Sequence, residues 1–189
     1  MFRSVPNILT ILRLVLVPVI AAQLAREHYR QALALVFVAG VTDGLDGWLA
    51  RRFGWMTRVG AWLDPLADKA LLVTVYILLG VRAVLPVWLA VLVPLRDVFI
   101  LSMIGVGLLF TSVRTFPPSR WGKLSTIVQV FTALVVLADA AAGKLLPHAV
   151  VLSLVSITAA ATIWSGFDYG RRGFAMWRRW RIDDAASRR

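Results

Sequence analysis

The sequence predicts an all-α integral membrane protein with six transmembrane helices. Of its 189 residues, 59% are hydrophobic, and the mean hydropathy of +0.77 is far above that of an ordinary soluble domain. The apolar residues form continuous stretches of about 20 residues, long enough for a helix to cross a bilayer. These stretches do not alternate with polar residues, so β-strands are not favoured.

The helices are expected at the apolar stretches and are bounded by proline and glycine. The six predicted spans are 9–25, 31–50, 61–80, 84–111, 122–142 and 147–168. Pro6, Pro86 and Pro147 lie near span starts, where the missing N–H of proline costs least. Gly80 and Gly143 lie near span ends, where helices often stop. We expect residues 1–170 to form one membrane domain and residues 171–189 to form a basic cytoplasmic tail.

The first span raises the question of a cleavable signal peptide. Arg3 precedes an apolar stretch, and small residues follow at Ala22 and Ala25. However, Arg13 interrupts the apolar stretch, and a protein with several spans does not need its first segment removed. We therefore expect the first helix to be retained.

Basic residues are distributed unevenly among the expected loops. One side would hold Arg3, Arg51, Arg52, Arg58, Arg114, Arg120, Lys123 and the seven arginines of the tail. The opposite side would hold Arg26, Arg30, Arg82 and Lys144. The positive-inside rule then predicts that both termini, and the loop between the second and third spans, lie in the cytoplasm. The Ala- and Arg-rich composition favours a bacterial inner membrane, with a mitochondrial membrane as the alternative.

The net charge of +11 does not indicate nucleic-acid binding. The basic residues lie at the ends of apolar segments, and no soluble basic domain is present. They favour topology signals and contacts with anionic lipid head groups instead. The absence of cysteine excludes disulfides and thiolate metal sites.

Acidic residues gather at the second and third spans, although the chain is otherwise poor in acid. In the second span, Asp43, Asp46 and Gly47 have i, i+3, i+4 spacing, which places them on one helical face. Arg51 follows one turn beyond Gly47 on roughly the same face. This end of the span is expected at the cytoplasmic side of the membrane.

The third span carries a matching face. Gly60, Asp64 and Asp68 have i, i+4, i+8 spacing, which again gives one face if the helix is continuous. Pro65 raises the alternative that the helix starts or bends near Asp64. Because a short loop joins the two spans, we expect them to be antiparallel neighbours with converging acidic faces.

Four converging carboxylates are costly in a membrane unless they are paired, protonated or bound to metal. The basic partners expected in the core are few: Lys69, Arg96 and Arg51. Oxygen-rich sites suit hard divalent cations, and two such ions would neutralise four carboxylates. A pair of divalent ions is also the usual clamp for displacement at phosphorus. The alternative is an interhelical salt-bridge network or a proton relay.

The whole pattern resembles a known family signature. The spacing D-x2-D-G-x2-A-R-x8-G-x3-D-x3-D, from Asp43 to Asp68, matches every fixed position of the CDP-alcohol phosphotransferase signature. These membrane enzymes make phospholipids by displacing CMP from a CDP-linked donor. The resemblance implies six transmembrane helices, a homodimer, and two Mg²⁺ or Mn²⁺ ions at a site open to the cytoplasm.

The resemblance also implies residue roles. The metal ligands would be Asp43, Asp46, Asp64 and Asp68, of which Asp68 would also be the general base. The residues lining the CDP site would be Gly47, Ala50, Arg51 and Gly60. The two glycines lack side chains and would let a phosphate or a base approach closely, and Arg51 offers phosphate a planar fork of donors.

Two further segments bear on the acceptor alcohol. "PNILTILRL" and "FGWMTRVGAWLDPLADK" resemble the glycerol-lipid branch, which contains phosphatidylglycerophosphate synthases and cardiolipin synthases. "LRDVFI" and "PPSRWGKLSTIVQ" are nearer to cardiolipin synthases, which predicts CDP-diacylglycerol as donor and phosphatidylglycerol as acceptor. Glycerol 3-phosphate is the alternative acceptor. The cations expected to bind the acceptor are Arg96, Arg114, Arg120 and Lys123.

Each of these expectations has a competitor. The loop cations can simply mark a cytoplasmic loop, and Arg96 can form a structural ion pair with Asp97. A transporter that conducts a cation or protons is the main rival function, and it predicts repeats or polar residues along several spans. The acids here lie instead at one depth on two adjacent spans.

Overall fold

Helices, and no strands, make up the part of the chain that the structure, a computed structural model, describes. It describes the backbone of residues 5–53, 58–110 and 119–187, and side chains at 12–44, 67–103, 105, 119–175 and 178. The helices are α1 (Val5–Ala25), α2 (Tyr29–Phe53), α3 (Arg58–Val81), α4 (Val87–Phe110), α5 (Arg120–Ala142) and α6 (His148–Ser187). The predicted all-α class and the order of six helices are confirmed.

The helices fall into two compact units. One unit consists of Met1–Ala90 and Ala133–Pro147, and the other of Val91–Thr132 and His148–Arg189. Helices α1, α2 and α3 lie in the first unit and α6 lies in the second, while α4 and α5 are divided between them. The two helices that carry the acidic signature therefore belong to one unit.

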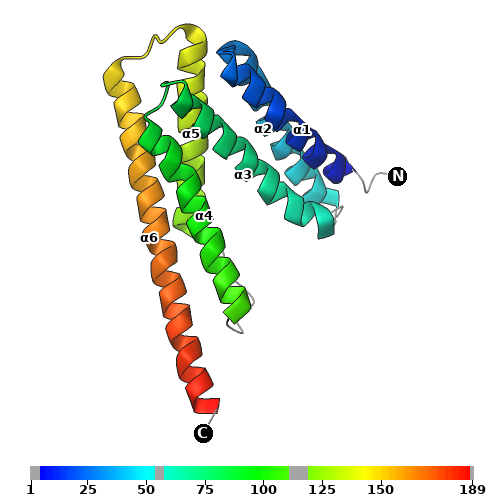
Figure 1. The fold of residues 1–189 in the computed structure, drawn as a ribbon. Helices are drawn as coiled ribbons and strands as arrows, with labels where there is room; N and C mark the ends of the chain where they lie inside the picture. The colour runs from blue at the N-terminus through cyan, green and yellow to red at the C-terminus, as the bar shows by residue number, and fades with distance from the viewer. Residues whose placement is uncertain (1–4, 54–57, 111–118, 188–189) are drawn as a thin grey trace. The chain divides into compact units, whose positions relative to one another are not determined.

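In the first unit, α1 packs along both α2 and α3 (Figure 1). Side chains from all three helices are fully buried: Ile20, Leu24, Ala32, Ala39, Tyr76 and Leu79. Helix α3 runs without interruption from Arg58, so the predicted alternative of a start near Asp64 is not observed. The acidic positions of α2 and α3 thus lie on continuous helices that share α1 as a neighbour.

Residues with left-handed backbone conformation follow three of the helices. They are Glu27 after α1, Ala83 after α3 and Gly143 after α5, with φ angles of 61°, 52° and 95°. A left-handed residue at this position is a common way to end a helix. The Lys144 N–H then donates to the Asp139 carbonyl at 2.8 Å. The predicted stop of the fifth helix at Gly143 is confirmed.

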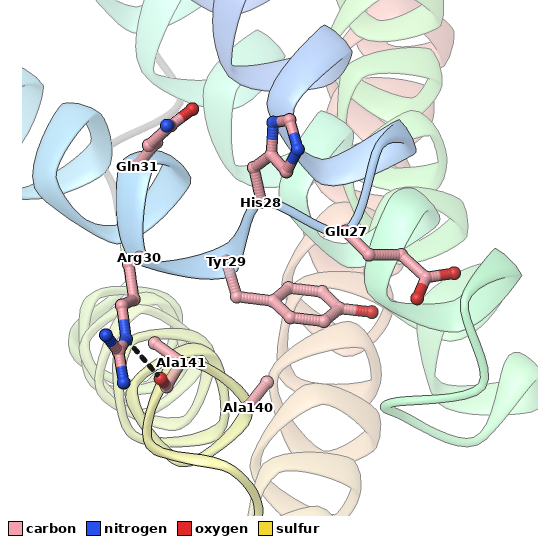
Figure 2. Close-up of a pocket in the computed structure, with 7 residues that line it drawn as sticks. All are labelled: Glu27, His28, Tyr29, Arg30, Gln31, Ala140 and Ala141. Carbon is pink, nitrogen blue, oxygen red and sulfur yellow. Dashed lines mark hydrogen bonds between the residues drawn. The ribbon is translucent and has the colours of Figure 1, made fainter.

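A side chain from the start of α2 contacts the end of α5 within the first unit (Figure 2). Arg30 Nε donates to the Ala141 carbonyl oxygen at 3.1 Å. This contact satisfies one of the carbonyls that a helix leaves unpaired at its C-terminus. A hollow of about 320 Å³ lies here, lined by Glu27, His28, Tyr29, Arg30, Gln31, Ala140 and Ala141.

Buried hydroxyl and amide groups join α5 to α6 in the second unit. Gln129 Nε2 donates to Thr162 Oγ1 at 2.9 Å, and Thr158 Oγ1 donates to Thr132 Oγ1 at 2.8 Å. All four side chains are at most 1% exposed. Polar contacts of this kind hold helices together in lipid, where apolar contacts between helices gain little over contacts with lipid tails.

The exposed surface is rich in large apolar side chains. Phe37, Ile127 and Phe167 are 63%, 64% and 63% exposed, whereas the charged Arg13 and Arg96 are buried. Apolar surface on this scale is typical of contact with lipid. By length and apolar composition alone, two helical segments of the described chain could span a membrane, Arg120–Ala142 and His148–Ala175.

Helix α6 is longer than the predicted sixth span. It contains 40 residues and continues through the basic stretch to Ser187 (Figure 1). The predicted span, 147–168, covers only its first half. The division of the chain into a membrane domain and a tail at residue 170 stays a prediction.

Candidate active site

One buried arginine joins two of the four predicted metal-binding aspartates. Arg13 Nη2 lies 2.5 Å from Asp43 Oδ1, and Arg13 Nη1 donates to Asp68 Oδ1 at 2.6 Å. The Arg13 side chain is 3% exposed, whereas those of Asp43 and Asp68 are 44% and 49% exposed. The carboxylates therefore reach a buried guanidinium while about half of each aspartate side chain stays exposed.

The packing of the first unit explains this arrangement. Helix α1 contacts both α2 and α3, so one side chain of α1 can reach Asp43 on α2 and Asp68 on α3. The guanidinium group is a planar fork of donors, which suits two carboxylate partners. A buried charge is strongly unfavourable without such partners. The structure thus brings the first and last aspartates of the signature to one point.

The role of Arg13 was missed in the sequence. The expected basic partners were Lys69, Arg96 and Arg51. Arg13 was considered as an interruption of the first apolar stretch and as part of the segment PNILTILRL, but not as a partner of the aspartates. A signal was available, because an arginine inside an apolar span almost always faces the protein interior and pairs with another group. What the sequence lacked was the identity of the helices that pack against it.

The remaining signature residues lie on the same two helices. Helix α2 holds Asp46, Gly47, Ala50 and Arg51, and α3 holds Gly60 and Asp64, but their side chains are outside the described part of the chain. Since both helices are continuous, Asp46 shares a face with Asp43, and Asp64 shares a face with Asp68. The roles predicted for all these residues stay predictions.

The donor chemistry of the site fits hard divalent cations. All four signature aspartates offer oxygen atoms, which Mg²⁺ and Mn²⁺ prefer as ligands. Asp43 and Asp68 are close enough to share one guanidinium, and about half of each side chain is exposed. Among the described side chains no group of three or more metal-binding residues is assembled, and Asp46 and Asp64 are not among these side chains.

In the second unit, Arg96 forms the ion pair that was considered as an alternative to acceptor binding. Its Nη1 donates to Asp97 Oδ1 at 2.7 Å, and its Nη2 donates to Ser165 Oγ. Its guanidinium carbon lies 5.9 Å from the centre of the Tyr169 ring. Both charged side chains are nearly buried, 7% and 6% exposed. Arg96 is thus held by a neighbouring carboxylate and by α6.

The start of α5 packs closely against Tyr169. The Ser119 hydroxyl caps α5 by accepting from the Gly122 N–H at 2.8 Å, and the Ser119 N–H donates to the Tyr169 hydroxyl at 3.1 Å. A Cβ at Gly122 would lie 2.8 Å from Tyr169 Cε2, so glycine permits the approach. Arg120 and Lys123 on this turn are exposed, and Arg114 lies outside the described residues.

A groove runs between α4 and α6 in the same unit. It has a volume of about 800 Å³, and its lining is largely apolar, with Phe99, Ile163 and Phe167 among the wall residues. Arg96 and Arg171 also line it. Apolar walls of this kind are suited to lipid chains.

Comparison with known proteins yields one family. The model of the family described as CDP-alcohol phosphatidyltransferase matches residues 3–163 of the chain. The match includes the entire acidic signature and α1, which carries Arg13. It extends over all helices up to the middle of α6.

Relatives of this chain carry two different names. It is 37% identical over 178 residues to a "Probable phosphatidylglycerophosphate synthase" of Mycobacterium tuberculosis, covering 89% of this chain and 81% of that protein. It is 32% identical over 167 residues to a "Probable cardiolipin synthase (CMP-forming)" of Drosophila melanogaster, covering 88% of this chain but 50% of that protein. A "CDP-diacylglycerol--glycerol-3-phosphate 3-phosphatidyltransferase 2" of Arabidopsis thaliana is 31% identical over 192 residues, covering 93% and 80%.

Proposed function

The chain belongs to the CDP-alcohol phosphatidyltransferase family, and on this premise we propose that it moves a phosphatidyl group from CDP-diacylglycerol to a glycerol-type alcohol, releasing CMP. The observation that carries the proposal is the complete signature from Asp43 to Asp68. Its first and last aspartates meet at Arg13, on helices of one compact unit. The names of the relatives support the glycerol-lipid branch.

Four aspartates would hold two divalent cations, Mg²⁺ or Mn²⁺, namely Asp43, Asp46, Asp64 and Asp68. These ions, when bound, would neutralise the carboxylates and offset the negative charge of the pyrophosphate. Gly47, Ala50, Arg51 and Gly60 would line the CDP site. Arg51 would donate to a phosphate, and the two glycines would allow the nucleotide to approach both helices closely.

Asp68 is the proposed general base. It accepts the proton of the acceptor hydroxyl, and that oxygen attacks the phosphorus on the diacylglycerol side of the pyrophosphate. The bond from this phosphorus to the bridging oxygen breaks, and CMP leaves with that oxygen. The product has a phosphodiester bond to the acceptor. The exposed half of the Asp68 side chain gives the hydroxyl a route of approach.

Phosphatidylglycerol is the acceptor that we favour, and glycerol 3-phosphate is the alternative. The segments around Arg96 and Lys123 support the first choice, because they are nearer to cardiolipin synthases. Relatives named for each reaction are similarly close to this chain, so they support both. The residues proposed to bind the acceptor are Arg96, Arg114, Arg120 and Lys123.

The proposed setting is a bacterial inner membrane. The distribution of basic residues supports cytoplasmic termini and a site that opens to the cytoplasm. CMP released at the acid-bearing ends of α2 and α3 would then enter the cytoplasm. We further propose a homodimer, on the resemblance to the family alone.

An assay with purified protein tests the reaction. Protein in detergent micelles is supplied with CDP-diacylglycerol and Mn²⁺, and then with phosphatidylglycerol or glycerol 3-phosphate. CMP release that depends on one acceptor is expected, and the lipid that forms identifies which. No CMP release with either acceptor, nor with inositol or serine, would contradict the proposal. Cation flux in proteoliposomes without CMP release would favour the transporter instead.

A further inference from the structure

We propose that Arg13 is a positioning residue that holds Asp43 and Asp68 in the arrangement that binds the metal ions. This inference rests on the proposed function and goes beyond it, because Arg13 lies outside the acidic signature. Arg13 touches neither substrate in this role. It acts through the two carboxylates that it joins.

The contacts of the guanidinium group carry the proposal. Its two terminal nitrogens each engage one Oδ1 atom, that of Asp43 at 2.5 Å and that of Asp68 at 2.6 Å. Because both nitrogens belong to one planar group, the two oxygens are held at a fixed separation. The third nitrogen, Nε, is buried without a hydrogen-bond partner in the described part of the chain. The polar contacts described for this side chain are therefore those with the two aspartates.

Arg13 is buried, whereas the two aspartates that it contacts are partly exposed. The Arg13 side chain is 3% exposed, so water competes little for its hydrogen bonds. The aspartate side chains are 44% and 49% exposed, so part of each stays accessible while it contacts Arg13. Arg13 therefore orients the carboxylates from the interior without covering the exposed part of either.

A purely structural ion pair is the competing explanation. In that case Arg13 would stabilise the packing of α1, α2 and α3, and its loss would lower the melting temperature without changing metal affinity. A positioning role predicts an effect on metal binding in the folded protein. Loss of a group that orients metal ligands typically weakens metal binding about 10- to 100-fold.

Titration of the full chain with Mn²⁺, followed by electron paramagnetic resonance, separates the two explanations. The variants are Arg13→Gln, which removes the charge and the fork, and Arg13→Lys, which keeps the charge but cannot hold both oxygens alike. The matched control is Arg82→Gln, which breaks an ion pair with Glu27 (3.2 Å) in the same unit. We expect about 10- to 100-fold weaker binding for Arg13→Gln, an intermediate loss for Arg13→Lys, and wild-type affinity for the control.

Wild-type Mn²⁺ affinity in folded Arg13→Gln would overturn the proposal, even with a lowered melting temperature. If Arg13→Gln does not fold, Arg13→Lys decides in the same way. Failure of the wild-type protein to bind Mn²⁺ would overturn the proposed metal dependence as well. Normal CMP release by the wild-type protein, with unchanged metal binding in both Arg13 variants, would overturn the positioning role alone.

Discussion

Asp68 has two tasks in the proposed reaction, since it binds metal and accepts a proton, and it also holds the guanidinium of Arg13. Asparagine in its place keeps the shape and one acceptor oxygen, so the contact with Arg13 can persist. It cannot accept the proton. We expect Asp68→Asn to lower the rate of CMP release by about 10²- to 10⁴-fold, the usual contribution of a general base. Binding of CDP-diacylglycerol, measured separately by calorimetry, should be largely retained.

A second aspartate of the same unit provides the control for this substitution. Asp139 Oδ1 accepts from the Leu146 N–H at 2.8 Å after α5 and is not part of the acidic signature. Asp139→Asn keeps an acceptor at this position, so turnover should remain near that of the wild type. Near wild-type turnover in Asp68→Asn would remove Asp68 from the role of base.

Residue spacing selected the candidate aspartates but did not predict how they are held. The i, i+3 and i, i+4 patterns needed only local helix geometry, so Asp43 and Asp68 could be singled out from the chain alone. Arg13 lies 30 residues before Asp43 in the sequence, and pairing at that range depends on which helices pack together. Arg96 and Asp97 are adjacent, and their ion pair was accordingly among the predicted alternatives.

Among the helices, α3 and α4 pack closely against each other at Gly80, near the end of α3. A Cβ built at Gly80 would overlap the Cβ of Ala90, and neither atom belongs to a flexible side chain that could move away. Gly80→Ala should therefore push α3 and α4 apart where they meet. We expect it to destabilise the protein by about 1–3 kcal/mol, the usual cost of overpacking, seen as a lower melting temperature in detergent.

Gly40 in α2 is the matched position for this test. A Cβ at Gly40 would meet nothing within 4 Å of the described structure. Gly40→Ala should leave the melting temperature unchanged or raise it slightly, since alanine favours the helix by about 0.4–1 kcal/mol over glycine. Equal melting temperatures for the two variants would show that α3 and α4 do not pack as closely as described.

Helix positions were predictable because apolar stretches, prolines and glycines are local signals. The predicted third and fifth spans, 61–80 and 122–142, differ from α3 and α5 by at most three residues at either end. The end of α6 was not predictable in the same way, because hydropathy marks where a chain leaves the apolar layer. Arginine, alanine and methionine beyond residue 170 are good helix formers, so the helix continues after the apolar residues stop.

Across the whole molecule, exposed apolar side chains suit a membrane, and the distribution of charge predicts the orientation of the chain in it. Large apolar side chains are exposed on the helices, as suits lipid contact. The predicted cytoplasmic loops and tail hold most of the basic residues. Orientation matters for the proposed chemistry, because it decides on which side the acidic face of α2 and α3 releases CMP.

The absence of cysteine in the chain makes this orientation directly measurable. Leu145, between α5 and α6, is 78% exposed, and Ser187 is the last residue of α6. In intact bacterial cells, a membrane-impermeant maleimide should label Leu145→Cys from outside. Ser187→Cys should react only after the inner membrane is opened, because the basic tail is expected in the cytoplasm.

The cysteine-free parent sets the background for this experiment, and a denatured sample confirms that each introduced thiol can react. The opposite labelling pattern would place the acidic face of α2 and α3 outside the cytoplasm. CMP would then be released outside, and the cell could not reuse it. Labelling of both positions from the same side would mean that α6 does not cross the membrane. In the predicted six-span topology, the sixth span lies between these two positions and places them on opposite sides of the membrane. That result would therefore contradict the predicted topology of the whole chain.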